Sequence, residues 1–174
     1  MLEMLQSLGI HTQINDKRYA GNLVETLFQG ELTPLQKQAA ESLLKDECGV
    51  LCATTAFGKT VVGAWLIARR RTNTLILVHR QQLMDQWHER LQNFLDLTSI
   101  GRVGGGKDQR TGLVDIAMLQ SLNRKGEVQD KVADYGQIIV DECHHLSAFR
   151  FEQVMKQVKA KYVCGLTATP SRKD

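Results

Sequence analysis

Hydrophobic residues along the chain form short unbroken runs, separated by longer stretches in which they recur every three or four positions. Runs such as LILV at 75–78 and IIV at 138–140 are typical of strands that are covered on both faces. The runs predict strands over Val50–Ala53, Thr74–Val78, Ile100–Val103, Val114–Met118, Gln137–Asp141 and Tyr162–Thr167. The longer stretches predict helices over residues 33–46, 58–70, 80–95 and 147–160. This alternation favours an α/β fold, with a mainly parallel sheet and helices on both faces.

The first thirty residues do not follow this alternation. Residues 1–9 predict a short helix that ends at Gly9, and residues 10–16 and 22–30 predict a hairpin around KRYAG. We therefore expect a small N-terminal appendage over residues 1–30 and one main domain over residues 31–174. In the main domain, Thr33 is the expected N-cap of the first helix, with Pro34 at its first position.

Composition limits the class of protein. The chain has 174 residues, of which 43% are hydrophobic and 24% charged, and its formal net charge is +3. These values indicate one folded domain of ordinary size, and the small positive charge is compatible with an anionic partner. No apolar run reaches the roughly 18 residues of a membrane span, and the N-terminus lacks the regions of a signal peptide, so we expect a cytoplasmic location.

The cysteines show no paired CxxC spacing that would indicate a zinc site. They are Cys48, Cys52, Cys143 and Cys164. Because free cysteine is usually buried, we expect structural thiols. A metal site built from Cys143, His144 and His145 stays open as an alternative, although successive residues of a strand point in opposite directions.

The segment ATTAFGKT, residues 53–60, joins a predicted strand to a predicted helix. Such a turn leaves the first N–H groups of the helix free to bind an anion. Gly58 lets the backbone approach a phosphate, Lys59 can reach the β and γ oxygens, and the Thr60 hydroxyl can bind Mg²⁺. Thr55, Ala56 and Phe57 complete the expected nucleotide loop. The alternative interpretation is a glycine turn with a surface lysine, and Ala53 stands where the P-loop pattern begins with glycine.

Two carboxylates follow the run IIV. Hydrolysis of ATP requires one group that holds Mg²⁺ and another that orients or deprotonates the attacking water. Asp141, at the end of a buried strand, is the candidate metal ligand together with Thr60, and Glu142 is the candidate base. A solvated acidic loop is the alternative, but it would leave the buried approach unexplained.

These motifs resemble those of the superfamily 2 helicases and translocases of the DExH-box type. DECH at 141–144 resembles their motif II, ATTAFGKT their motif I and LTATP at 166–170 their motif III. The segments LTPLQKQAA, LILVHRQQLMDQW and IAMLQSL extend the similarity over most of residues 31–174. The motifs DECHH and GLTATP are similar to those of XPB-like and restriction-enzyme-type motors.

The resemblance implies a RecA-like ATP-binding domain and roles for individual residues. Gln36 would read adenine, and Lys59, Asp141, Glu142 and His144 would be catalytic. Thr167 and Thr169 would couple the nucleotide to nucleic acid, DNA more than RNA. The expected nucleic-acid contacts are Arg80, Gln81, Gly105, Lys107, Gln120 and Ser121. The family has glycine at the position of Ala56, which puts nucleotide affinity in question.

The chain stops at SRKD, shortly after LTATP. Relatives of this type continue into a second RecA-like domain that supplies an arginine finger, so we expect an excised first motor domain with weak activity alone. Two alternatives stay open. One is a P-loop switch or kinase that never touches nucleic acid, and the other is a non-catalytic nucleic-acid-binding module.

Overall fold

The computed structural model describes residues 2–13, 15–124, 127–128, 130–142 and 148–168. Its centre is a seven-stranded sheet in which only the last strand is antiparallel to its neighbour. In spatial order the strands are β1 (Cys48–Cys52), β9 (Tyr162–Thr167), β8 (Gln137–Asp141), β2 (Thr74–Val78), β5 (Val114–Met118), β3 (Gly101–Gly104) and β4 (Lys107–Gln109). The mainly parallel α/β architecture expected from the sequence is confirmed.

The strand predictions are most accurate in the middle of the sheet. The bounds of β2, β5, β8 and β9 match those predicted, whereas β1 and β3 are shifted along the chain. The sequence did not indicate β4, because all three of its residues are exposed and it carries no hydrophobic run. A second small hairpin of β6 (Asn123–Arg124) and β7 (Glu127–Val128) also lacks such a run.

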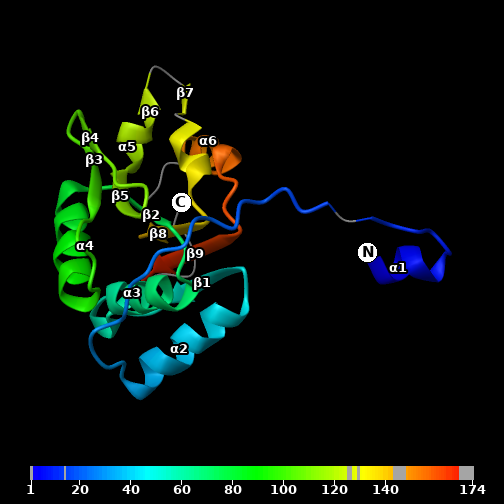
Figure 1. Ribbon diagram of the computed structural model, residues 1–174, viewed down its shortest axis with the longest axis horizontal. Coiled ribbons are helices and arrows are strands. Elements are labelled where there is room, and N and C mark those ends of the chain that lie inside the picture. The colour runs from blue at the N-terminus through cyan, green and yellow to red at the C-terminus, as the bar shows by residue number, and fades with distance from the viewer. Residues whose placement is uncertain (1, 14, 125–126, 129, 143–147, 169–174) are drawn as a thin grey trace.

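Helices cover both faces of the sheet (Figure 1). On one face lie α2 (Pro34–Lys45), α3 (Lys59–Arg70) and α4 (Gln81–Phe94). On the other lie α5 (Leu119–Leu122), a 3₁₀ turn at Asp130–Asp134 and α6 (Ala148–Gln157). Alternate residues of each central strand enter the two cores: Ile76 packs with the first set of helices, and Leu75 with the second. Burial on both faces explains the unbroken hydrophobic runs.

The N-terminus of α2 is capped as predicted. Thr33 Oγ1 accepts a hydrogen bond from the Gln36 amide at 3.3 Å, and Gln36 Oε1 accepts one from the Thr33 amide at 2.9 Å. Pro34 occupies the first helical turn. This capping box fixes the side chain of Gln36 at the end of the helix that faces the loop after β1.

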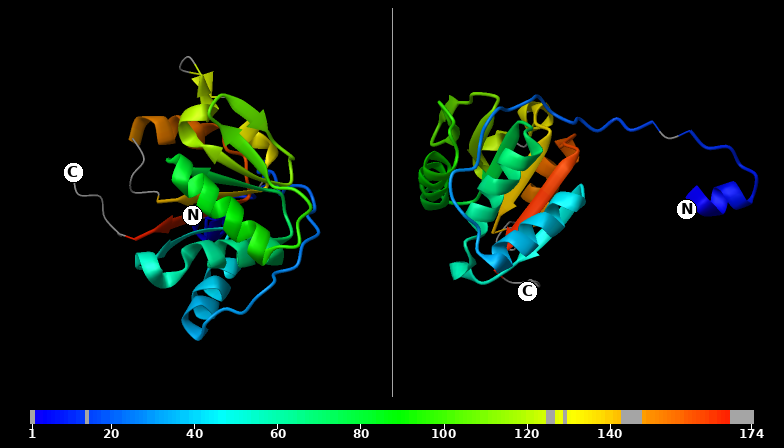
Figure 2. Two further views of the ribbon diagram at one scale, coloured as in Figure 1. Left: turned by 90° about the vertical axis from the view of Figure 1, so that its left-hand side faces the viewer. Right: turned by 60° about the horizontal axis from the view of Figure 1, so that its bottom comes forward.

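The expected N-terminal hairpin is wrong for the residues that the structure describes. The predicted helix is present as α1 (Leu2–Ser7). The β pairing described for residues 19–28 consists of isolated bridges to the main domain, which pair Tyr19 with Ala160, Leu23 with Thr72 and Phe28 with Leu95. Alternate residues of NLVETLF are buried, as the pattern indicates: Val24 is 2% exposed and Thr26 5%. They pack against the main domain and not within a hairpin. Figure 2 shows this segment running along the domain, with α1 away from it.

The burial expected for the cysteines holds for one of those described. Cys164, in the central strand β9, is buried, but Cys48 and Cys52 are exposed because β1 is an edge strand. Cys143, His144 and His145 lie outside the described residues. Within the described residues, no group of three or more histidine, cysteine or acidic side chains is placed to hold a metal ion. No helix in that part of the chain is long and apolar enough to cross a membrane.

Candidate functional site

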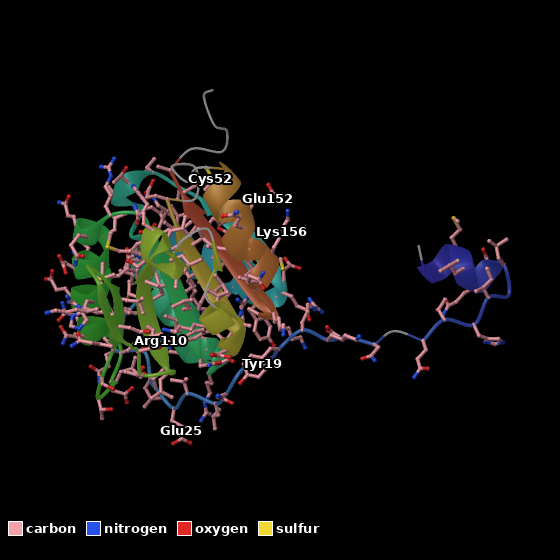
Figure 3. The ribbon with its side chains drawn as sticks, turned by 90° about the horizontal axis from the view of Figure 1, so that it is seen from above. Tyr19, Glu25, Cys52, Arg110, Glu152 and Lys156 are labelled. Carbon is pink, nitrogen blue, oxygen red and sulfur yellow. The ribbon has the colours of Figure 1, made fainter. Side chains whose placement is uncertain are left out.

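The carboxyl ends of the parallel strands place the predicted nucleotide residues on one edge of the sheet. β9 separates β1 from β8, with Thr167 in register with Cys52 and Leu166 with Asp141. Lys59 Nζ, after β1, lies 4.0 Å from Oε1 of Glu142, after β8. Figure 3 shows Cys52 at this edge, at the opposite end of the domain from Arg110 and Glu25. The structure therefore brings together the two motifs on which a shared nucleotide site depends.

The loop between β1 and α3 is held by contacts from two neighbouring elements, β9 and α2. Its first amide, from Ala53, donates to the carbonyl of Thr167 at 3.0 Å. Gln36 Nε2 donates to the carbonyl of Phe57 at 2.7 Å, which joins α2 to the loop. Gly58 has a φ of 82°, and a Cβ there would lie 2.6 Å from Gln36 Nε2. The left-handed backbone conformation therefore favours glycine, and a larger residue would displace the Gln36 amide.

Alanine at position 56 fits this loop. Ala56 lies in the 3₁₀ turn Thr55–Phe57, and the only non-glycine residues with positive φ in the described chain are Arg71 and Glu142. The glycine of the family is therefore not needed here for a left-handed conformation. The reservation about nucleotide affinity that the sequence raised has no basis in backbone strain.

Lys59 is almost completely buried, with 6% of its surface exposed. Its ammonium group donates to the carbonyl oxygens of Ala53 at 2.9 Å and Thr54 at 3.2 Å, both in the same loop. These contacts, with Glu142 nearby, satisfy a charge that would be costly to bury alone. A surface lysine on a simple glycine turn, the alternative interpretation, does not describe this residue. Thr60 follows it in the first turn of α3 and is partly exposed.

Asp141 is buried at the end of β8, with 6% of its surface exposed. Burial raises the pKa of its carboxyl group, and the hydrogen bond from Trp87 opposes that shift. Trp87 Nε1 donates to Oδ2 at 2.8 Å, and the amide of Glu142 donates to Oδ1 at 3.0 Å. Glu142 itself has a φ of 52°, an uncommon value for a residue with a side chain. The acidic pair is thus built into the end of the sheet and is not a solvated loop.

Sequence reasoning did not identify Trp87. It lies on the buried face of α4 with Met84 and Leu91, at helical spacing that is typical of ordinary core residues. Its bond to Asp141 joins residues that are distant in sequence, so no local pattern could have revealed it.

The structure describes only one of the residues predicted to couple nucleotide and nucleic acid. Thr167 is 3% exposed at the end of β9, and its carbonyl oxygen holds the first amide of the nucleotide loop. It therefore connects the strand between the two motifs directly to the loop. His144 and Thr169 lie outside the described residues.

The predicted nucleic-acid residues follow β2, β3 and β5, which end at the same edge of the sheet. Arg80 is the N-cap of α4 and Gln81 its first residue, and both are exposed. Gln120 Nε2 donates to the carbonyl of His79 at 2.9 Å, which joins the ends of β5 and β2. Gly105 has a φ of 58° in the turn between β3 and β4.

A cavity of about 180 Å³ brings some of these residues together. It is lined by Val103, Gly106, Lys107, Asp108, Gln120, Ser121 and Lys131. The first residues of α4 and Gly105 are not among its lining residues. Lys131 was not predicted, because it comes from the 3₁₀ turn before β8 and no motif marks it.

Asp108, which lines this cavity, forms ion pairs with two basic side chains, Lys131 and Arg110. Lys131 Nζ donates to its Oδ2, and Arg110 Nε donates to its Oδ1 at 2.9 Å. The hydrogen bond from Lys131 is the main cause that lowers the pKa of Asp108 to about 2, with Arg110 contributing. The charges that line the cavity are therefore partly balanced within the protein.

The fold and the residues at this edge define a RecA-like domain of the helicase and translocase ATPase type. Residues 29–172 match the family described as "Type III restriction enzyme, res subunit", and the chain belongs to that family. A curated relative, the "DNA 3'-5' translocase XPB2" of Sulfurisphaera tokodaii, is 33% identical over 144 residues, which are 83% of this chain and 32% of the relative.

Solved structures share the fold at lower identity. The UvsW helicase of bacteriophage T4 superposes with a TM-score of 0.68 and 16% identity, over 97% of this chain and 68% of that one. The SWI2/SNF2 ATPase core of Sulfolobus solfataricus, solved with double-stranded DNA, has a TM-score of 0.69 and 17% identity, over 86% and 34% of the two chains.

The chain spans about a third of the length of the translocase relative. Family membership does not favour a P-loop switch or a non-catalytic module, the alternatives that the sequence left open. Members of a helicase family use a nucleotide, so the edge that carries Lys59 and Asp141 is the candidate nucleotide site.

Proposed function

We propose that this chain is the ATP-binding motor domain of a helicase or translocase, which couples ATP hydrolysis to movement on nucleic acid. Residues 31–174 form the motor domain, and residues 1–30 are an appendage whose second half packs along it. The observation that carries the proposal is the 4.0 Å approach of Lys59 Nζ to Glu142 Oε1 at the edge where the parallel strands end. In open α/β sheets, ligands bind outside the carboxyl ends of the strands.

The loop at 53–60 would bind the phosphates of ATP. The backbone amides at the start of α3 and the helix dipole favour an anion there. Lys59 would exchange the carbonyl oxygens of Ala53 and Thr54 for phosphate oxygens, which are charged and stronger acceptors. Gln36, already held against Phe57, would contact adenine from the start of α2.

The residues beside the loop fit a magnesium ion. Asp141 offers a carboxylate and Thr60 a hydroxyl, and Mg²⁺ prefers such hard oxygen ligands, with phosphate oxygens and water completing its shell. A bound ion would neutralise charge on the transferred phosphate. Asp141 enters such a site already oriented by two hydrogen bonds.

Glu142 would orient or deprotonate the water that attacks the γ-phosphate. Its carboxylate is within 4.0 Å of the lysine that would hold that phosphate, and its side chain is 19% exposed, which leaves access for water. Thr167, together with His144 and Thr169, would link the phosphate to the strand ends that face nucleic acid. Such coupling requires an element with two arrangements that both ligands bias.

Nucleic acid would lie along the ends of β2, β3 and β5. Lys107, Gln120 and Ser121 line one cavity there, and Arg80 and Gln81 begin α4 at the same edge. Contacts of these residue types to phosphates are largely independent of sequence. A relative named as a DNA translocase and a fold neighbour solved with double-stranded DNA support DNA over RNA.

A second RecA-like domain is the expected partner of this chain. The chain spans 32% of the translocase relative and 34% of the SWI2/SNF2 chain, which leaves room in both for another domain of this kind. If that domain supplies an arginine finger, residues 1–174 assayed by themselves should hydrolyse ATP slowly.

Glu142→Gln tests the proposal. The variant should bind a fluorescent ATP analogue with Mg²⁺ as the parent chain does, and its hydrolysis should fall about 100-fold or more, because the base is lost and the charge that binds the metal is kept. The matched control is Glu152→Gln, a surface glutamate of α6 paired with Lys156 and labelled in Figure 3, which should leave both measurements unchanged. Failure of the parent chain to bind the analogue at any Mg²⁺ concentration would overturn the proposal.

A further inference from the structure

Trp87 is a buried core residue that also makes a polar contact, a hydrogen bond to Asp141. Its side chain is 1% exposed and lies on the face of α4 that packs against α3 and the sheet. The ring lies against Gly63 of α3, where a Cβ would be 2.6 Å from Cη2 of the indole. Space for this large ring is therefore made on the neighbouring helix by a glycine.

The polar end of the ring meets the acidic pair. Trp87 Nε1 donates to Asp141 Oδ2 at 2.8 Å, while Asp141 Oδ1 accepts from the amide of Glu142 at 3.0 Å. Each carboxylate oxygen thus has one fixed donor, and rotation of the carboxylate would break both bonds. Each oxygen also keeps lone-pair capacity for a further partner.

A phenylalanine at position 87 would keep an aromatic ring in the core, although a smaller one, and would have no N–H group. The indole adds one donor in a direction that only Asp141 uses among the described residues, and a buried indole N–H is usually satisfied. The partner is the side chain that the proposed function assigns to magnesium. Hydrogen bonds of this kind behind a metal ligand orient the ligand and tune its affinity.

We propose that Trp87 is a positioning residue for the metal site: it fixes the orientation in which the Asp141 carboxylate receives Mg²⁺. The inference rests on the proposed nucleotide function. It also connects that site to α4, because Trp87 lies two turns after Arg80 and Gln81 at the start of that helix.

The first test removes the N–H group together with part of the indole ring. Trp87→Phe should raise the Mg²⁺ concentration for half-maximal binding of the fluorescent ATP analogue about tenfold, a loss typical of residues behind a metal ligand. At saturating Mg²⁺, affinity for the analogue should return to that of the parent chain. The matched control is Trp65→Phe, which changes the other tryptophan, on α3, and should shift the Mg²⁺ requirement less than twofold.

A second test leaves the core intact and stands even where Trp87→Phe does not fold. The chain has two tryptophans, so a ¹⁵N-labelled sample gives two indole N–H signals, and Trp65→Phe assigns them. Asp141→Asn should shift the Trp87 signal upfield in the proton dimension, because a neutral acceptor is weaker than a carboxylate. Adding Mg²⁺ to the nucleotide-loaded parent chain should also move that signal, and the Trp65 signal should move less.

The outcomes separate this inference from the proposed function. Nucleotide binding with an unchanged Mg²⁺ requirement in a folded Trp87→Phe variant would overturn the positioning role and leave the proposed function standing. If neither Asp141→Asn nor Mg²⁺ shifts the Trp87 indole signal, the positioning role is likewise overturned and the proposed function still stands. Absence of nucleotide binding by the parent chain would overturn both.

Discussion

Lys59 and Glu142 come from motifs far apart in the chain, yet Nζ of the first lies 4.0 Å from Oε1 of the second. The lysine side chain is 6% exposed and that of the glutamate 19%. Because β1 and β8 are parallel and separated only by β9, residues that follow them meet at one edge of the sheet.

Removal of the lysine charge should weaken nucleotide binding. Lys59→Ala deletes the donor that we expect to bind the β and γ phosphates, and a charge-assisted hydrogen bond of this kind contributes about 1.5–3 kcal/mol. A loss of about 10- to 150-fold in affinity for the ATP analogue is therefore expected in a fluorescence titration. Lys45→Ala, at the exposed C-terminal end of α2, is the control and should bind as the parent chain does.

Alanine at position 58 should disturb the loop in two ways. Gly58 has a φ of 82°, and a Cβ there would lie 2.6 Å from Gln36 Nε2, so the variant bears backbone strain and displaces Gln36 from Phe57. Gly112→Ala is the matched control: its φ is 76° and nothing lies within 4 Å of a Cβ, so only the strain of about 1–2 kcal/mol applies. Denaturant unfolding should give a larger loss of stability for Gly58→Ala, and only this variant should lose nucleotide affinity.

Gln36 should decide which base is bound. Gln36→Ala removes the amide that we expect to contact adenine, along with its bond to the Phe57 carbonyl. The expected result is a fall in ATP affinity of about fivefold, equal to one neutral hydrogen bond of about 1 kcal/mol, with little change for GTP. Competition of both nucleotides against the fluorescent analogue measures this difference. Gln38→Ala, an exposed position of the same helix, should leave the preference for ATP intact.

Lys107 should contribute to nucleic-acid binding through charge. If it contacts a phosphate, Lys107→Ala weakens binding to all sequences alike and lowers the slope of log affinity against log salt by about 1. Fluorescence anisotropy with labelled DNA duplexes of unrelated sequence, at several salt concentrations, measures both quantities. An unchanged slope, equal to that of the control Lys45→Ala, would show that this lysine contacts no phosphate.

The ion pair of Asp108 should make stability depend on pH in the acid range. Lys131 and Arg110 lower the pKa of Asp108 from 3.8 to about 2. The stabilisation is therefore present above pH 4 and is lost as the pH falls toward 2. Because about a third of this side chain is exposed, its contribution should be only about 0.5 kcal/mol.

Asp108→Asn tests this expectation. Denaturant unfolding at pH 7 should show the variant less stable than the parent chain, and the difference should shrink as the pH approaches 2. Asp134→Asn, an exposed residue of the 3₁₀ turn that carries Lys131, is the control. A difference between Asp108→Asn and the parent chain that stays constant with pH would contradict the assigned ion pair.

Much of the central sheet could be predicted from the sequence, because each strand is marked by a hydrophobic run of adjacent residues. Strands β2 and β8 are buried on both faces, so every residue in them had to be apolar or satisfied, and the strand ends fall where the runs end. The acids after Val140 are located by the end of β8. The loop before Lys59 follows the edge strand β1 instead, and its glycine and lysine, not a buried run, mark it in the sequence. By contrast, β4 is exposed throughout, and a run of polar residues does not distinguish a strand from a turn.

The sequence by itself determined which strands end in phosphate-binding and acidic chemistry, because a hydrophobic run followed by a motif is a property of a few adjacent residues. Only the tertiary structure decided which remote side chains meet. It set Trp87 against Asp141, brought Lys131 into the cavity beside Lys107, and packed Val24 on the main domain where a hairpin was expected. Hydrophobic periodicity specifies that a face is buried, but the element that covers it is chosen by the packing of the whole domain.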